Sequence, residues 1–218
     1  MSEHERGRSK SLDGLIKRAG QSLDEGACFE AERVAEKAVA AARTHADWAA
    51  MIDAVDLLQA ARTQRRDPSL VKGAVRILDE PGEEDDVLEP GRWLIQPPLV
   101  GAVARRLRLN SLAKDIPVLV LCREPTTQLG LIPLVAIAPG TTVRVQVKPP
   151  SNERKPTAAW FRSGMSALGD AALDRIDGGL ELERRIDALL GALDAVPDHD
   201  GICDLLVETC RTALNEQA

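Results

Sequence analysis

The stretch that decides the fold runs from residue 93 to residue 121 and reads WLIQPPLVGAVARRLRLNSLAKDIPVLVL. It contains two short apolar runs, Trp93–Ile95 and Ile116–Leu121, on either side of a helical pattern from Leu99 to Leu112. A continuous run of Val and Leu is typical of a strand that is buried on both faces, which requires helices on the sheet. The stretch therefore predicts a β–α–β unit with two parallel strands.

Both flanks extend this unit into a larger sheet. Upstream, Val71–Leu78 predicts another strand, and the acidic run from residue 80 to residue 90, which contains Pro and Gly, predicts an exposed loop. Downstream, Leu131–Ala138 and Thr142–Val147 are joined by Pro139-Gly140-Thr141, which favours a β-hairpin. We therefore expect a mixed sheet of about five strands.

Helical patterns precede and follow this sheet. Alanine-rich helical segments fill the chain from Leu12 to about Gln64, and one-sided apolar patterns return after the Pro-rich run at 148–156. The fold class is therefore α+β, with N-terminal and C-terminal helical units around a small mixed β-sheet that contains one βαβ unit and a hairpin. We expect four segments: a disordered tail at 1–10, a repeat-like helical unit at 11–66, a mixed α/β sheet unit at 70–150 and a three-helix unit at 155–216.

The N-terminal helices carry a resemblance to a known family. The run GACFEA at residues 26–31, followed by Ala35 and Ala38-Val39, resembles the second helix of a tetratricopeptide repeat. The resemblance covers one helical hairpin, residues 12–43, and departs from the family where Cys28 stands in place of an aromatic residue. Such arrays normally need about three repeats to bury a core, so this hairpin is expected to pack on something else. An ordinary alanine-rich hairpin is the competing interpretation.

Composition narrows the classes of partner. Lys and Arg number 28 against 34 Asp and Glu, which gives a formal net charge of -6. Affinity for a phosphate backbone comes mainly from clustered cations, and stacking on single strands needs aromatic side chains, which make up only 2% of this chain. Nucleic acid is therefore an unlikely partner.

The sequence also bears on location. It contains no apolar run of the roughly 18 residues that a membrane span needs, and its first ten residues are polar. The four cysteines form no Cys-x-x-Cys pair, as a zinc ribbon or a dithiol redox site would require. We expect a cytoplasmic protein with reduced thiols and no membrane partner.

The apolar helix faces predict the main function. In the third helical segment Trp48, Met51 and Val55 recur at steps of three and four. Because the predicted helices have more apolar surface than one small sheet can cover, we expect a surface for another molecule. The prediction is a non-enzymatic protein–protein interaction or adaptor protein that binds a protein or peptide and self-associates as a homo-oligomer. Phe29, Trp48, Met51 and Val55 are its expected contact residues.

The alternative is a small enzyme or an anion-binding protein with its site at the strand end 122–128. Cys122 and Arg123 directly follow an apolar strand, at the end where α/β sheets bind ligands. This pair resembles the active loop of rhodanese-type sulfurtransferases, which implies a Cys122 thiolate stabilised by backbone N–H groups. The loop departs from that family because no second basic residue follows Arg123. In this alternative Arg123 binds an anion with Thr126 and Thr127 as hydroxyl donors, whereas a buried structural cysteine is the competing interpretation.

A cluster of basic residues suggests a third possible function. Arg105, Arg106 and Arg108 lie on the helix of the β–α–β unit, and with Lys114 they could gather phosphate or an acidic partner. Association with RNA or the ribosome through the same face is a further alternative. A solvated helix face is the favoured interpretation because the whole chain is acidic.

One group of residues contains metal-ligating atoms. His199 and Cys203 share a helical face, but no obvious closing ligand accompanies them. Helix capping by Asp198 or Asp200 together with core thiols is therefore favoured. We expect neither a metal nor a cofactor.

Overall fold

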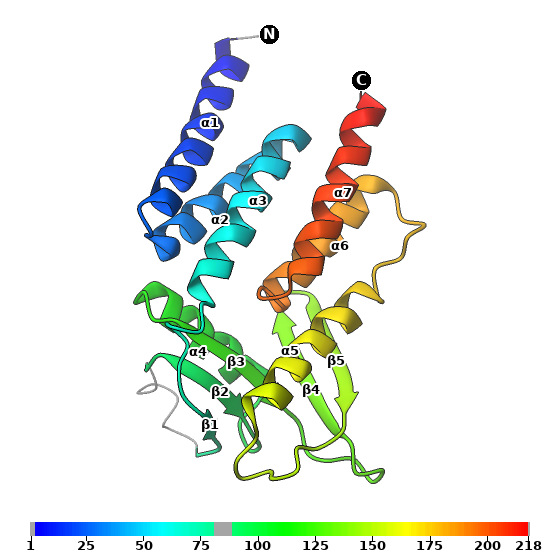
Figure 1. The fold of residues 1–218 in the computed structure, drawn as a ribbon. Coiled ribbons are helices and arrows are strands. Elements are labelled where there is room, and N and C mark those ends of the chain that lie inside the picture. Colours follow the sequence, from blue (N-terminus) through cyan, green and yellow to red (C-terminus); the bar gives the residue numbers. More distant parts are fainter. Residues whose placement is uncertain (1–2, 81–88, 218) are drawn as a thin grey trace. The chain divides into compact units, whose positions relative to one another are not determined.

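A computed structural model describes residues 3–80 and 89–217. Over these residues the chain forms seven helices and one five-stranded mixed sheet, so the predicted α+β class is confirmed (Figure 1). In chain order the elements are α1 (Glu3–Asp24), α2 (Cys28–His45), α3 (Trp48–Arg65), β1 (Val75–Leu78), β2 (Gly91–Ile95), α4 (Gly101–Ala113), β3 (Val118–Arg123), β4 (Ile132–Ala138), β5 (Thr141–Val147), α5 (Ala158–Leu173), α6 (Leu182–Ala195) and α7 (Asp200–Gln217).

The chain divides into two compact units. The helical unit comprises residues 1–65, 178–187 and 203–218, and the sheet unit comprises residues 66–177 and 188–202. This division differs from the expected one, because α5 belongs with the sheet and α6 and α7 are each shared between the units.

The N-terminal segment also differs from expectation. Helix α1 begins at Glu3, inside the stretch 1–10 that was expected to be a disordered tail. No proline interrupts the sequence ahead of Leu12, so the helix can continue through this stretch, since propagating a helix is easier than starting one.

The five strands follow one another in chain order across the sheet. β1, β2 and β3 are parallel, whereas β4 and β5 run antiparallel to their neighbours. The predicted β–α–β unit is formed by β2, α4 and β3, and the predicted hairpin by β4 and β5. The hairpin turn has Gly140 at a φ of 73°, a left-handed conformation that glycine adopts without strain.

Helices α4 and α5 cover opposite faces of the sheet. Cys122 and Val135 belong to the apolar cluster beneath α4, which also contains Leu107 of that helix. On the other face Leu121 and Leu134 meet α5 at Gly164, where a Cβ atom would lie 2.9 Å from Leu134 Cδ1. The glycine therefore permits α5 to lie close to the strands.

The helical unit is built on small side chains. In α2, Ala31, Ala35, Ala38 and Ala42 are buried, which lets neighbouring helices approach closely. Helix α2 packs against both α1 and α3. Asp47 precedes α3 and accepts a hydrogen bond from Ala50 N at 3.0 Å, which caps the start of that helix.

A buried ion network connects α2 to α3. The Glu32 carboxylate accepts hydrogen bonds from Arg62 Nε at 2.8 Å and from Arg65 Nε at 2.7 Å. The three side chains are between 1% and 6% exposed. Arg62 also reaches the more exposed Glu36, with Nη2 at 2.9 Å from Oε1. The Glu32 carboxylate is therefore the buried anion that both guanidinium groups share, and Arg62 has the half-exposed Glu36 as a second partner.

The first prediction concerns this network. Changing Glu32 to Gln leaves two buried cations without their shared anion, so we expect the free energy of unfolding to fall by about 3–5 kcal/mol. Glu36→Gln is the matched control, and because Glu36 is half-exposed we expect it to cost less than about 1 kcal/mol. Urea titration followed by circular dichroism measures both, and equal small losses would contradict the assigned role of Glu32.

Candidate functional site

The residues expected to contact a partner lie mostly in the core. Trp48, Met51 and Val55 are at most 1% exposed, and Phe29 is half-buried. The apolar face of α3 is therefore covered, because α1 and α2 pack against this helix. Within the described residues, the exposed large apolar side chains form no continuous stripe along one helix. They are Leu70, Val100, Leu109, Leu129 and Leu214.

The strand end after β3 forms a self-contained loop. Cys122 is buried, and burial, followed by the nearby Glu124 carboxylate, raises the pKa of its thiol to about 12. Arg123 Nη1 donates to Glu153 Oε2 at 2.8 Å. Thr127 Oγ1 accepts from Leu131 N at 3.1 Å and lies 3.2 Å from Leu131 O. The contacts of Arg123 and Thr127 hold the loop in place, and burial keeps the Cys122 thiol protonated at neutral pH.

Arg123 also joins the other hydroxyl residue of this loop. Its Nη2 lies 3.5 Å from Thr126 Oγ1. The structure thus brings Arg123 and Thr126 together, while Thr127 instead bonds within the turn that leads to β4. The enzyme alternative rests on Cys122, Arg123, Thr126 and Thr127. In these contacts the four side chains do not converge on one position that a ligand could occupy.

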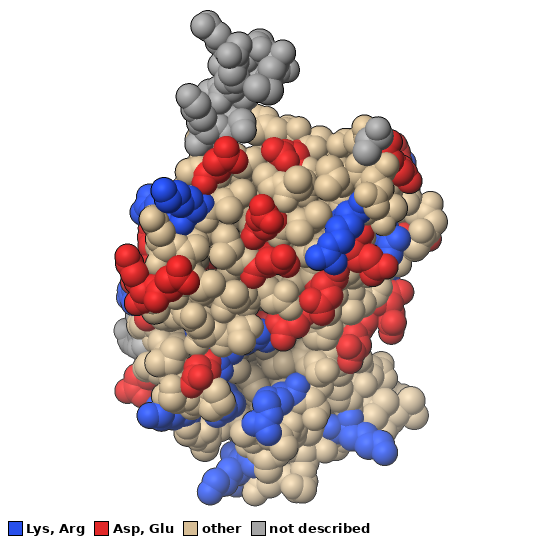
Figure 2. Space-filling model, turned by 45° about the horizontal axis from the view of Figure 1, so that its top comes forward, with Lys and Arg blue, Asp and Glu red and all other residues tan. Residues whose placement is uncertain are grey.

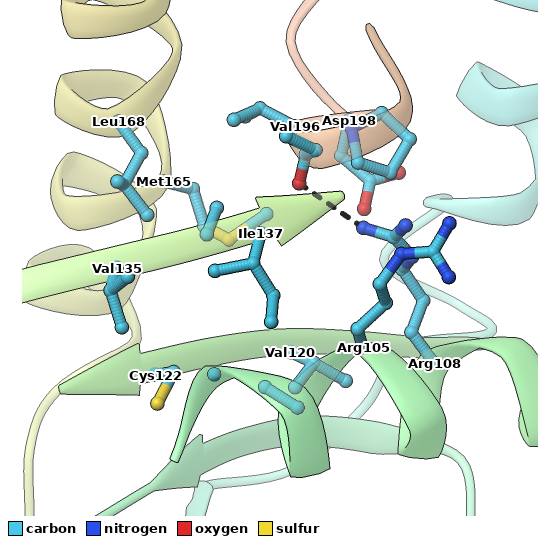
Figure 3. A pocket seen from close by; sticks show the side chains of 15 residues that line it. Arg105, Arg108, Val120, Cys122, Val135, Ile137, Met165, Leu168, Val196 and Asp198 are labelled. Carbon is cyan, nitrogen blue, oxygen red and sulfur yellow. Dashed lines mark hydrogen bonds between the residues drawn. The ribbon is translucent and has the colours of Figure 1, made fainter. Parts of the chain in front are cut away.

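A narrow slot lies beside Cys122, where β3 and β4 diverge (Figure 3). The two strands pair only at Cys122↔Val135 and Arg123↔Leu134. Beyond these pairs the slot is lined by α4, β3, β4, α5 and residues 195–198. Its volume is about 30 Å³, which is room for little more than one water molecule. The slot is therefore too small for a substrate.

The arginines of α4 that border this slot have structural partners. Arg105 Nη2 contacts both carboxylate oxygens of Asp194, at 2.9 and 2.8 Å. Arg108 donates to the main-chain oxygens of Asp194 at 2.7 Å and of Ala195 at 3.2 Å, and the second bond is drawn in Figure 3. These carbonyl groups belong to the last turn of α6. A cation there is stabilising, because the C-terminal end of a helix dipole is negative. Arg105 and Arg108 thus hold the end of α6, which weakens the phosphate interpretation.

His199 also packs within the sheet unit. Its Nε2 lies 3.3 Å from Asp170 Oδ1, and a Cβ atom at Gly169 would lie only 2.0 Å from the imidazole ring. Across the described ranges 3–80 and 89–217, no group of three or more His, Cys, Asp or Glu side chains could hold a metal ion. His199 is therefore a structural residue that packs against α5.

The backbone of β5 offers a different kind of site. β5 is the last strand of the sheet, so one of its sides has no neighbouring strand. Pro133 O accepts from Glu124 N at 2.8 Å and therefore faces β3, and Pro133 is paired with Gln146. Because backbone groups alternate in direction along an antiparallel strand, the N–H and C=O of Arg144 and Gln146 point away from β4.

Helix α5 supplies partners at the two ends of this edge. Arg175 Nη1, just beyond α5, donates to Thr142 O at 2.7 Å, and Trp160 Nε1 donates to Lys148 O at 2.9 Å. Between these points Arg144 and Gln146 are exposed, and within the described part of the chain their outward backbone groups make no hydrogen bond. The middle of β5 is therefore an open edge with two donors and two acceptors.

A hollow of about 330 Å³ lies beside the first half of this edge. Its lining is mixed: Val143 of β5, Ile176 beyond α5 and Ala192 of α6 supply apolar surface, while Thr141, Thr142 and Arg175 supply polar groups. Ligand sites are typically concave, apolar and of roughly 300 Å³ or more, with a few polar groups that orient the ligand. The hollow and the open edge together form the candidate site, which we call the β5 site.

The sequence contained a signal for this site. In β5, valines at 143, 145 and 147 alternate with Thr142, Arg144 and Gln146, as in a strand with one covered and one solvated face. Positive charge on such a strand is typical of a sheet edge. The hollow had no such signal, because it depends on where α5 and α6 lie.

Comparisons with protein-family models, with curated proteins and with solved structures found no match to this chain. Among the described residues no helix has the length and apolar character needed to cross a membrane.

The second prediction concerns the thiols. All four cysteines are buried, and burial raises the pKa of Cys28, that of Cys122 to about 12 and that of Cys210 to about 11. Since the thiolate is the reactive form, we expect every thiol of the folded protein to react with a chromogenic aromatic disulfide at pH 7.5 at least about tenfold more slowly than after unfolding. One rapidly reacting thiol, traced to Cys122 with Cys122→Ser, would restore the enzyme alternative.

Proposed function

We propose that this protein is a non-enzymatic adaptor that binds an extended segment of another protein along β5. The observation that carries the proposal is the open middle of the β5 edge, with unpaired backbone groups at Arg144 and Gln146, beside a hollow of about 330 Å³. The proposal keeps the predicted function and moves the contact surface from α3 to the sheet.

Pairing with an edge strand suits this geometry. A guest strand forms main-chain hydrogen bonds with the edge, and pockets for alternate side chains provide specificity. The outward groups of Arg144 and Gln146 supply four such bonds, and guest side chains directed toward α5 would lie next to the hollow. An extended peptide therefore uses both parts of the β5 site at once.

The enzyme alternative has weaker support. Cys122 has a raised thiol pKa, and Arg123 and Thr127 are engaged within the loop. The predicted self-association would use the same edge of β5, with a second copy of the chain as the guest, and it is one outcome of the test below.

The third prediction tests the use of the edge. We expect a displayed library of random linear peptides, selected on the full-length protein, to yield peptides that bind the wild type. Gln146→Pro removes an outward N–H and places a ring at the edge without removing a bond to β4, so we expect it to weaken binding by at least about tenfold. Gln146→Ala, the matched control, keeps the N–H and should change binding less than about twofold.

A second measurement covers the case in which Gln146→Pro does not fold, which circular dichroism would show. The selected peptide is then synthesised with N-methyl groups on alternate residues, which removes the donors on one of its edges. Two such peptides are compared, one methylated at the odd positions and the other at the even positions, and we expect one of them to lose binding to the wild type. Equal binding by both peptides, or a library without binders, contradicts the proposal.

A further inference from the structure

We propose that the guest of the β5 site is a strand in which acidic residues alternate with apolar residues. This inference rests on the proposed function and specifies the chemistry of the partner. It follows from the different character of the two faces of β5.

One face of β5 is polar and cationic. Arg144 and Gln146 point to this face, and both side chains are exposed. By the same alternation Lys148 follows on this side, and within the described residues it has no ion pair. Side chains of a guest strand that lie on this face would stand beside two cations, and opposite charges across strands stabilise pairing.

Arg144 keeps hydrogen-bonding capacity for a guest. Its Nε contacts Glu124 Oε1 at 3.1 Å and Oε2 at 3.3 Å, while its side chain is 57% exposed. Those two contacts use a single donor, so the Nη groups remain for a second carboxylate. Glu124 therefore competes with an acidic residue of the guest for contact with Arg144.

The other face of β5 is apolar. Val143 is buried beneath α5, and Val145 and Val147 are half-buried on the same side. The hollow opens on this side, with Ala172 and Ile176 in its lining. Guest side chains directed here would leave water, so apolar residues are favoured at alternate positions.

Arg175 adds a further cation next to the hollow. One of its Nη groups donates to Thr142 O, which leaves other guanidinium donors for a guest carboxylate. Figure 2 shows Lys and Arg as the main charged side chains on the visible face of the sheet unit. An acidic guest therefore matches the charge of the site.

A second copy of the chain fits this edge less well. Antiparallel pairing of two β5 strands would place Arg144 and Lys148 of both copies on one face, where like charges oppose each other. Cations on an edge strand are a common means of preventing such self-pairing. The charge of β5 therefore favours an acidic partner over self-association.

Two synthetic peptides test this inference. Each is acetylated, amidated, labelled with a fluorophore and seven residues long, with valine at odd positions; one has Glu, Thr and Glu at the even positions and the other has Lys, Thr and Lys. Fluorescence anisotropy with the full-length protein should show at least about tenfold tighter binding of the acidic peptide at low salt, with the difference shrinking as salt rises.

Variants of β5 should change this preference, which is the fourth prediction. Arg144→Glu should weaken binding of the acidic peptide about tenfold and strengthen binding of the basic one, whereas Glu124→Gln should strengthen binding of the acidic peptide by a few fold. Lys72→Glu makes the same change in net charge ahead of β1, at the opposite edge of the sheet, and should leave both affinities within about twofold.

The outcomes separate the two proposals. If library peptides bind in a Gln146-dependent manner but the basic or an uncharged peptide binds as well as the acidic one, the charge inference is overturned and edge binding stands. If no peptide binds at the edge, both fail. A dimer in sedimentation velocity that Gln146→Pro dissociates would identify a second copy as the guest and would also overturn the inference.

Discussion

Each backbone N–H and C=O group of a sheet needs a hydrogen-bond partner, and this constraint connects the main features of the sheet unit. β3 and β4 pair only at Cys122↔Val135 and Arg123↔Leu134, and the two edge strands, β1 and β5, each have one side without a neighbouring strand. Trp160 of α5 and Arg175, just beyond this helix, satisfy the ends of the open side of β5. They can do so because Gly164 lets α5 lie close to Leu134. The same packing that covers the sheet face thus leaves a short central segment of β5 open.

Arginine has several roles in this chain, and its surroundings decide which one applies. Arg65 is buried and shares the Glu32 carboxylate with a second guanidinium. Arg108 lies at the end of α6 and donates to main-chain carbonyl groups, which places its charge where the helix dipole is negative. Arg144 stands exposed on an edge strand with part of its donor capacity unused. The sequence shows the same residue type in all three places, and only the neighbouring elements distinguish them.

This dependence on neighbours explains which sequence predictions held. The β–α–β unit and the β4–β5 hairpin follow from local periodicity and turn residues, so they could be predicted from residues 93–147 alone. The apolar pattern of α3 was also clear, but a pattern does not tell what covers it. The small side chains of α2 bring the helices close together, and Trp48, Met51 and Val55 became core residues. The β5 site depended in turn on the strand order, which connects residues far apart in the sequence.

The chemistry of an open edge also limits how the proposed adaptor could work. Four backbone hydrogen bonds contribute roughly 0.5–1.5 kcal/mol each, and ordering a flexible guest offsets much of this gain. Main-chain pairing at Arg144 and Gln146 would therefore give weak binding that does not depend on the guest's sequence. Side chains must supply the remainder, through burial against the valine face and the hollow and through contact with the cations of the edge. In the proposed adaptor, selectivity would thus rest on the side chains that alternate along β5, while the backbone between them would fix the guest's direction and register.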